Sequence, residues 1–183
     1  MKFQFYYEKL INSEEYLKFK KEFPKAYFCS AFFVLDNEKS ENKVHFDFYI
    51  PEGPKMYSFK LDRKTEFVNV EQFNPQVPEK LPMNFNFDLK EIEEIIRKEM
   101  AEKDIKGRIQ KLLFSLQRLK NEDYLIATIF LSNMALLKVE IKLPENKITN
   151  FEKRSFFDMI KIVKGNRQEN LKKQEESKNK EIN

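Results

Sequence analysis

The feature that most constrains this chain is the run 124–141, YLIATIFLSNMALLKVEI, its longest nearly uncharged stretch. A membrane-spanning helix needs about 20 consecutive apolar residues, and the charged residues Asp123 and Lys138 enclose a much shorter segment. The N-terminus, MKFQFYYEKLINSEEYLKF, carries acidic residues where the apolar region of a signal peptide would lie. The sequence therefore predicts a soluble protein.

The composition of this run favours two strands over one helix. Its first part, 124–131, is rich in β-branched and aromatic residues, which fit a pleated sheet. Ser132 and Asn133 supply turn chemistry, and apolar and charged residues then alternate over 136–143, as in a half-buried strand. A third strand is expected at 148–153. Because strand 124–131 has no charged face, we expect it to lie inside a sheet and to be covered on both sides.

The first part of the chain repeats this order. Residues 26–35 are again apolar on both faces, 43–50 alternate, and 56–61 place apolar residues on one face. A helix is predicted before each set of strands. Asn12 and Glu15 form a capping box for a helix that ends at Pro24.

The second set of strands is preceded by two predicted helices. Asp88 and Glu91 form a capping box for a helix that reaches Met100. A break is expected near Lys103, because the apolar stripe loses its phase there. Beyond Gly107, the spacing of apolar residues predicts a second helix that carries Ile109, Leu112, Leu113 and Leu116.

The fold class is therefore α+β, with two helix-β-β-β units whose antiparallel three-strand meanders pack on helices. Aligning the two aromatic-rich strands pairs Tyr27 with Tyr124 and Phe33 with Phe130. Internal duplication and chance likeness both explain that match. In outline, such a unit resembles cystatin-like and PepSY-like modules, and this resemblance implies no function. The domains are a first half at 1–61, an extended Pro-containing connector at 62–87, a second half at 88–163 ending in a helix at 155–163, and a charged, disordered tail at 164–183.

The composition limits the kinds of catalytic or metal-binding site that the chain can form. The chain has 3 Gly and no phosphate-binding loop, and it holds 1 His and 1 Cys. A lone cysteine cannot form an intramolecular disulfide, so a reducing, cytoplasmic location is expected. Cys29, His45 and Asp47 are the only nucleophilic triad available, and we interpret Cys29 as a buried core residue instead. His45 and Asp47 give too few ligands for a metal site. The sequence thus indicates a noncatalytic protein with no cofactor and no metal.

The function expected from the sequence is binding of another protein, or self-association, through an apolar sheet face. Helices of one layer cover one side of a sheet, so the second apolar face of each opening strand is left for another layer or a partner. The residues named for this role are Phe28, Phe32, Tyr49 and Ile129. The alternative is binding of single-stranded nucleic acid, in which Phe28, Phe32 and Tyr49 stack on bases near Lys60. The net charge of +4 is small for that role.

Overall fold

A computed structural model describes residues 1–39, 41–53, 55–61, 65–70 and 76–155. These residues form three helices and eight strands. In chain order they are α1 (Phe3–Ile11), α2 (Glu14–Glu22), β1 (Tyr27–Asp36), β2 (Lys43–Ile50), β3 (Lys55–Leu61), β4 (Thr65–Val70), α3 (Leu89–Glu102), β5 (Ile109–Leu119), β6 (Glu122–Leu131), β7 (Ala135–Leu143) and β8 (Lys147–Ser155).

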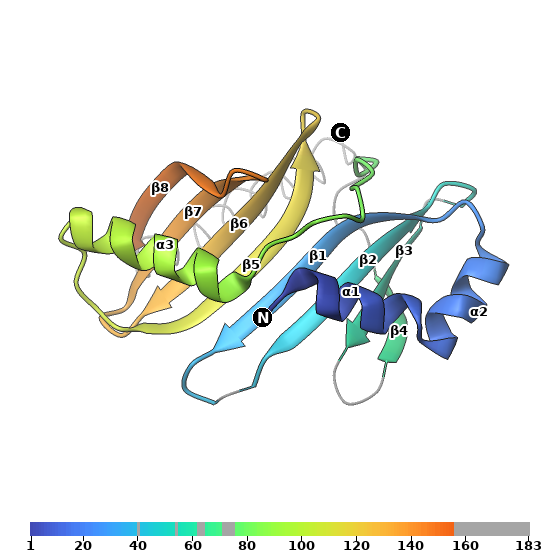
Figure 1. Ribbon diagram of the computed structural model, residues 1–183, viewed down its shortest axis with the longest axis horizontal. Coiled ribbons are helices and arrows are strands. Elements are labelled where there is room, and N and C mark those ends of the chain that lie inside the picture. Colours follow the sequence, from blue (N-terminus) through green and yellow to red (C-terminus); the bar gives the residue numbers. More distant parts are fainter. Residues whose placement is uncertain (40, 54, 62–64, 71–75, 156–183) are drawn as a thin grey trace, which may run out of the picture.

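All eight strands belong to one antiparallel sheet with the order β4-β3-β2-β1-β5-β6-β7-β8. Each half of the chain is thus a helical segment followed by a four-strand meander. The two halves join where β1 pairs with β5, with Phe33 opposite Phe114. In Figure 1, α1 and α2 lie over the strands of the first half and α3 lies over those of the second, all on the same side of the sheet.

Local sequence explains where the helices begin. The Ser13 side chain caps α2 by accepting a hydrogen bond from the Tyr16 N–H at 3.3 Å. The predicted cap, Asn12, is therefore displaced by one residue, and the helix ends before Pro24 as predicted. Asp88 caps α3 by accepting from the Lys90 N–H at 3.0 Å, and it also pairs with the N-terminal ammonium group at 2.6 Å.

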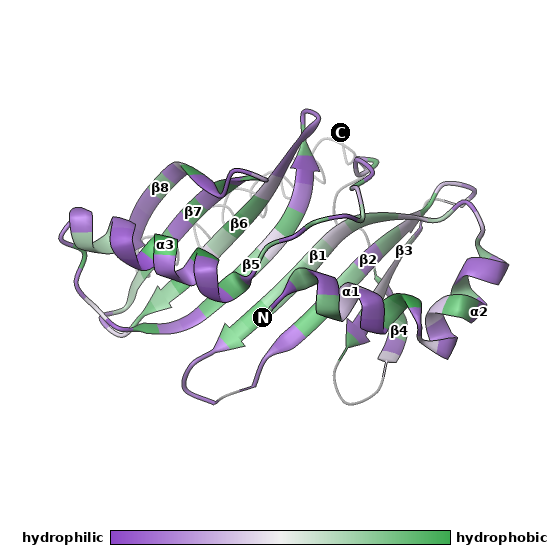
Figure 2. Cartoon of the chain, in the orientation of Figure 1, coloured by the Kyte–Doolittle hydropathy of each residue, from purple (hydrophilic) through white to green (hydrophobic). Residues whose placement is uncertain are grey.

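The core lies between the helices and the sheet and is built largely from phenylalanine. Figure 2 shows apolar residues running along β1 and β6 and apolar stripes on the helices. Phe3 is fully buried, and its ring lies within 6.4 Å, centroid to centroid, of each ring in a cluster formed by Tyr7, Phe28, Phe33, Phe46, Phe85 and Phe87. Each fully buried ring contributes about 1.5 to 3 kcal/mol, so this cluster holds α1 and the segment 85–87 on the sheet.

The structure corrects the prediction of a second helix near 109–116. Residues 109–119 form β5, which lies between β1 and β6. Leu112, Phe114 and Leu116 face the helices, whereas Leu113 faces the other way and is half-buried. The expected three-strand meander of the second half therefore has four strands, because β5 extends it.

The connector 62–87 also differs from the prediction. Thr65–Val70 form β4, which pairs with β3 and extends the first meander to four strands. Phe85 and Phe87 are buried, as the sequence indicated, while Phe67 is 41% exposed at the edge of the sheet.

Strands 26–35 and 124–131 were expected to be interior strands and structural equivalents of each other, and the structure supports only the first expectation. Both lie inside the sheet as predicted, since β1 pairs with β2 and β5, and β6 pairs with β5 and β7. By element order, however, β1 corresponds to β5, because each is the first strand after its helices. Phe33 faces the helices and Phe130 faces the opposite side, so those two residues are not counterparts.

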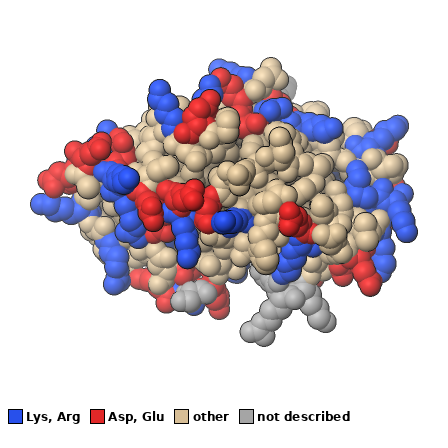
Figure 3. All heavy atoms as spheres, viewed as in Figure 1, with Lys and Arg blue, Asp and Glu red and all other residues tan. Residues whose placement is uncertain are grey.

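The predicted helix at 155–163 lies outside the described residues except for Ser155, which ends β8, and the predicted tail at 164–183 lies wholly outside them. Among the described residues, no helix is long and apolar enough to cross a membrane. Figure 3 shows the helix side of the molecule, where basic and acidic residues lie close together in several places and uncharged residues predominate in the middle of the view.

Candidate functional site

The two sides of the sheet differ in what covers them. On the side of the sheet that faces α1, α2 and α3, almost all strand side chains are buried. No described helix or strand lies over the opposite side, which we call the open face (Figure 1). Strand alternation therefore presents a broad surface of half-buried side chains on the open face.

The centre of the open face is apolar. Phe32 and Val34 on β1 lie beside Leu113 on β5, and Ile126 and Phe130 on β6 continue the same surface. All five side chains are half-buried, in contrast to their fully buried neighbours on the helix side. A contiguous apolar surface of this kind usually marks an interaction site.

The strands of the open face carry charges of both signs in nearly equal number. The basic residues are Lys43, Lys60, Lys111, Lys138, Lys142, Lys147 and Arg154, and the acidic residues are Asp36, Asp47, Glu66, Glu122, Glu140 and Glu152. Many are paired with one another, as in Lys111–Asp36 at 2.9 Å and Lys138–Glu140 at 2.9 Å. The open face is therefore close to neutral and rich in internal ion pairs.

A groove of about 540 Å³ lies at one end of the open face. Val34, Leu113 and Phe130 supply its apolar lining. Its charged lining alternates in sign and consists of Asp36, Glu38, Lys39, Glu41, Lys43 and Lys111. An apolar recess with a charged rim suits the insertion of one large apolar side chain.

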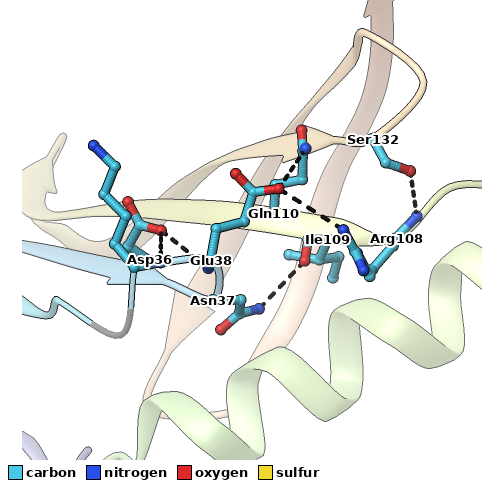
Figure 4. Close-up of polar contacts among 8 residues, drawn as sticks. Asp36, Asn37, Glu38, Arg108, Ile109, Gln110 and Ser132 are labelled. Atoms are coloured by element: carbon cyan, nitrogen blue, oxygen red, sulfur yellow. Dashed lines mark hydrogen bonds and ion pairs between the residues drawn. The ribbon is translucent and has the colours of Figure 1, made fainter.

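Hydrogen bonds fix the segment beside this groove (Figure 4). Asp36 accepts from the N–H groups of Glu38 at 3.1 Å and Lys39 at 2.9 Å, which shapes the turn after β1. Gln110 Nε2 donates to Glu38 Oε1 at 2.7 Å and ties that turn to β5. The Lys39 N–H and the Lys111 ammonium lower the pKa of Asp36 to about 2, so its carboxylate is ionised at neutral pH.

The four residues that the sequence indicated for binding lie on different sides of the sheet, two on the open face and two on the helix side. Phe32 lies at the centre of the open face. Tyr49 also lies on that side but is 4% exposed, with its ring 5.5 Å from that of Tyr27. Phe28 and Ile129 face the helices and are fully buried, so they belong to the core and are not available to a partner.

Cys29 is a free cysteine buried in the fold, as the sequence predicts. The residue lies at a β-bulge and is 2% exposed, and its thiol donates a weak hydrogen bond to the Asp47 carbonyl oxygen at 3.4 Å. Burial and the nearby Asp47 carboxylate raise the pKa of Cys29 to about 12. The thiolate that a nucleophile requires is therefore not formed at neutral pH.

Asp47 lies on the open-face side of β2, where its side chain is half-buried. Its Oδ2 accepts a hydrogen bond from the Ser30 hydroxyl at 2.7 Å. Burial raises the pKa of Asp47, while hydrogen bonds from Ser30 and Ser58 and the proximity of His45 oppose that rise. Within the described residues no group of His, Cys, Asp and Glu could hold a metal ion.

Leu113 and Phe130 lie on the open face, although their sequence patterns do not predict it. Helical spacing places Leu113 in a buried stripe, and strand alignment pairs Phe130 with Phe33, which is buried in the structure. The available signal was the alternation of Leu112, Phe114 and Leu116, which leaves Leu113 on the other side of a strand.

Comparisons with known proteins add little to this description. No protein-family model matches the chain, and no curated protein is significantly similar to it. A solved structure of a putative lipoprotein from Clostridium difficile 630 has 12% sequence identity and a TM-score of 0.48, with 77% of this chain and 91% of that chain covered. A likeness this distant transfers no function to the present chain.

Proposed function

We propose that the chain is a noncatalytic module that binds another protein through the open face of its sheet. The observation that carries this proposal is the apolar centre of that face, which no described element covers. Stable protein interfaces combine an apolar, aromatic centre with a polar rim. Phe32, Phe130 and Leu113 supply such a centre, and the ion-paired residues of β7 and β8 supply part of a rim.

The charge balance of the open face indicates the chemistry of the partner. Seven basic and six acidic residues, many of them paired internally, give no strong field of either sign. The partner we propose is a folded protein whose contact surface is apolar and near neutral. One of its large apolar side chains enters the groove lined by Val34, Leu113 and Phe130.

The same balance gives no support to the nucleic-acid alternative. Proteins that bind single strands concentrate basic residues along a groove that follows the phosphates. On the open face the basic residues alternate with acidic ones, and Phe28, one of the expected stacking residues, is buried.

We also infer that the two halves descend from a single α-ββββ unit. The mirrored strand order about the β1–β5 pair, with helices on one side of both halves, supports this inference. Superposing β1–β4 on β5–β8 tests it, since α1 or α2 should then coincide with α3.

The functional proposal is tested by affinity capture from native lysate with matched variants. Phe130→Glu places a charge in the groove, whereas Leu17→Glu places the same charge on α2, where Leu17 is already 51% exposed. We expect one protein to be captured by the wild type and by Leu17→Glu but not by Phe130→Glu, and to rebind after purification.

Three results would count against this proposal. One is capture that does not change with Phe130→Glu, and another is the absence of any protein that rebinds when purified. The third is a wild-type mass by light scattering that is twice that of Phe130→Glu, because a second copy would then occupy the face.

A further inference from the structure

The two edges of the sheet differ in how they are protected against pairing with another strand. β4 and β8 end the strand order, so among the described residues each has a neighbouring strand on one side only. An edge strand presents a row of backbone N–H and C=O groups to any further strand, and natural proteins usually block such pairing with charges or bulges. The composition of each edge therefore indicates whether it is built to accept a strand.

β8 has both kinds of protection. Four of its nine residues are charged, namely Lys147, Glu152, Lys153 and Arg154. The register of its pairing with β7 also shifts once, as at a bulge. Charged side chains and an irregular backbone both hinder the approach of another strand. The β8 edge is therefore poorly suited to extend the sheet.

β4 has neither kind of protection. It pairs with β3 in one uninterrupted register over all six of its residues, and Glu66 is its single charged residue. Phe67 is 41% exposed and Val68 is 36% exposed. The Phe67 ring lies on the helix side, with its centroid 5.6 Å from that of Phe59, and strand alternation places Val68 on the opposite side. β4 thus exposes an apolar side chain on each side of an unprotected edge.

Phe67 belongs to an aromatic cluster that reaches this edge. Its ring centroid lies 6.2 Å from that of Phe19 on α2 and 5.8 Å from that of Tyr57 on β3. Phe59 in the same cluster is fully buried, whereas Phe67 has no described strand beyond it. A strand added at this edge would place a side chain beside Phe67 and cover its ring, as cross-strand pairs do.

We propose that β4 pairs antiparallel with the β4 strand of a second copy of this chain. A two-fold axis perpendicular to the sheet relates the two strands and keeps the helices of both copies on one side. The pairing joins the two eight-strand sheets into one continuous sheet. Both edges that remain are then β8 strands, which are protected, so the assembly ends at two copies.

The sequence of β4 fits its own copy. Residues directly opposite each other in an antiparallel pair lie on the same side of the sheet, so a two-fold arrangement near the middle of β4 centres on Phe67 or on Val68. The first register sets Glu66 opposite Val68 and pairs residues 65–69, and the second sets Glu66 opposite Val70 and pairs residues 66–70. Like charges directly opposite each other would oppose pairing, and neither register brings the two Glu66 carboxylates together. A near-neutral, apolar strand of this kind suits a second copy of itself.

Light scattering of the full chain tests the proposal with lysine variants on the two edges. We expect the wild type to have twice the mass of a single chain. Val68→Lys should halve that mass, because lysine on an edge strand hinders pairing. Asn150→Lys adds the same charge at an exposed position on β8 and should leave the mass unchanged. Val68→Thr should also remain a dimer, since threonine suits a strand and main-chain hydrogen bonds carry the pairing.

Phe130→Glu separates this edge from the open face. Phe130 lies on β6, in the interior of the sheet, so the variant should remain a dimer. The inference therefore stands or falls independently of the function proposed for the open face.

Single cysteines test the two-fold arrangement. Under oxidising conditions, whichever of Phe67→Cys and Val68→Cys lies at the two-fold axis should form a covalent dimer, because the two thiols are then directly opposite each other. Asn150→Cys on β8 should form none. The native Cys29 is 2% exposed and should not contribute a cross-link.

Several results would overturn the proposal. They are a single-chain mass for the wild type, a dimer that survives Val68→Lys, a dimer that is also lost in Asn150→Lys, and the absence of a covalent dimer from both Phe67→Cys and Val68→Cys. A single-chain wild type that captures a different protein, and loses it in Val68→Lys alone, would likewise overturn it, because the edge would then accept a strand from another protein.

Discussion

Replacing Phe114 with alanine tests whether residues 109–119 form the strand that joins the two halves. Phe114 is fully buried, faces the helices and lies opposite Phe33 on β1 and Ala127 on β6. Paired strands on both sides prevent the site from collapsing, so the full cost of about 3 to 5 kcal/mol for a buried Phe→Ala change is expected. For a chain of this size that loss lowers the melting temperature by about 6 to 20 °C.

Leu113→Ala is the matched control, because Leu113 is the adjacent residue on the other side of the strand. It is half-buried on the open face, so its loss should cost about 1 kcal/mol. A helix with Leu113 in its buried stripe would reverse this order and place Phe114 toward solvent. Urea unfolding followed by circular dichroism gives both values, provided that the m-value is unchanged. A larger loss for Leu113→Ala than for Phe114→Ala would refute the strand assignment.

Three further predictions concern single side chains. Because the pKa of Asp36 is lowered to about 2, its carboxylate stabilises the fold above about pH 4. Asp36→Asn should therefore be less stable than the wild type at pH 6, and the difference in urea midpoint should vanish as the pH falls toward 2. Asp88→Ala removes the cap of α3 and should lower the free energy of unfolding by about 1 kcal/mol or more, whereas no change would argue against that cap. Phe28→Ala should cost about 3 to 5 kcal/mol and Phe32→Ala clearly less, since Phe28 alone of the two is fully buried. Equal losses would contradict their placement on opposite sides of the sheet.

Most of the elements could be predicted from the sequence because their patterns are unambiguous. Strands 43–50 and 136–143 alternate apolar and polar residues, and the structure confirms them as β2 and β7. Strands 26–35 and 124–131 are dense in β-branched and aromatic residues, and they are confirmed as β1 and β6. The helix after Asp88 follows from its cap and its buried stripe.

The sequence did not predict β5 as a strand because its apolar residues fit two patterns at once, the spacing of a helix and the alternation of a strand. Its leucines, glutamines and basic residues are good helix formers, and Ile109, Leu112, Leu113 and Leu116 fit a helical stripe. Pairing with β1 and β6 on both sides overrides that propensity. Lys120 and Asn121, both at positive φ, form the turn of the β5–β6 hairpin. Asn121 is the residue in the sequence that indicates this turn, because asparagine favours positive φ in tight hairpin turns.

The location of the candidate site could be predicted only in outline. The sequence indicated that the opening strands have a second apolar face, but it could not show which residues point to it. Phe28 and Phe32 are four residues apart, yet a β-bulge between Phe28 and Ser30 shifts the alternation between them. As a result, Phe28 is buried under the helices and Phe32 lies on the open face.

The most direct test of the open face is the reaction rate of cysteines placed on it. The native Cys29 is buried with a raised pKa and should react slowly with a thiol reagent, which leaves a clean background. Ser115→Cys and Thr128→Cys put single thiols at half-buried positions near the centre of the face.

In the full, folded chain we predict that both new thiols react much faster than Cys29 and approach their rates in denaturant. Adding the captured partner should slow both reactions. Rates as slow as that of Cys29 in the isolated full chain, recovered when residues 156–183 are removed, would contradict the account, because the chain would then cover its own sheet face.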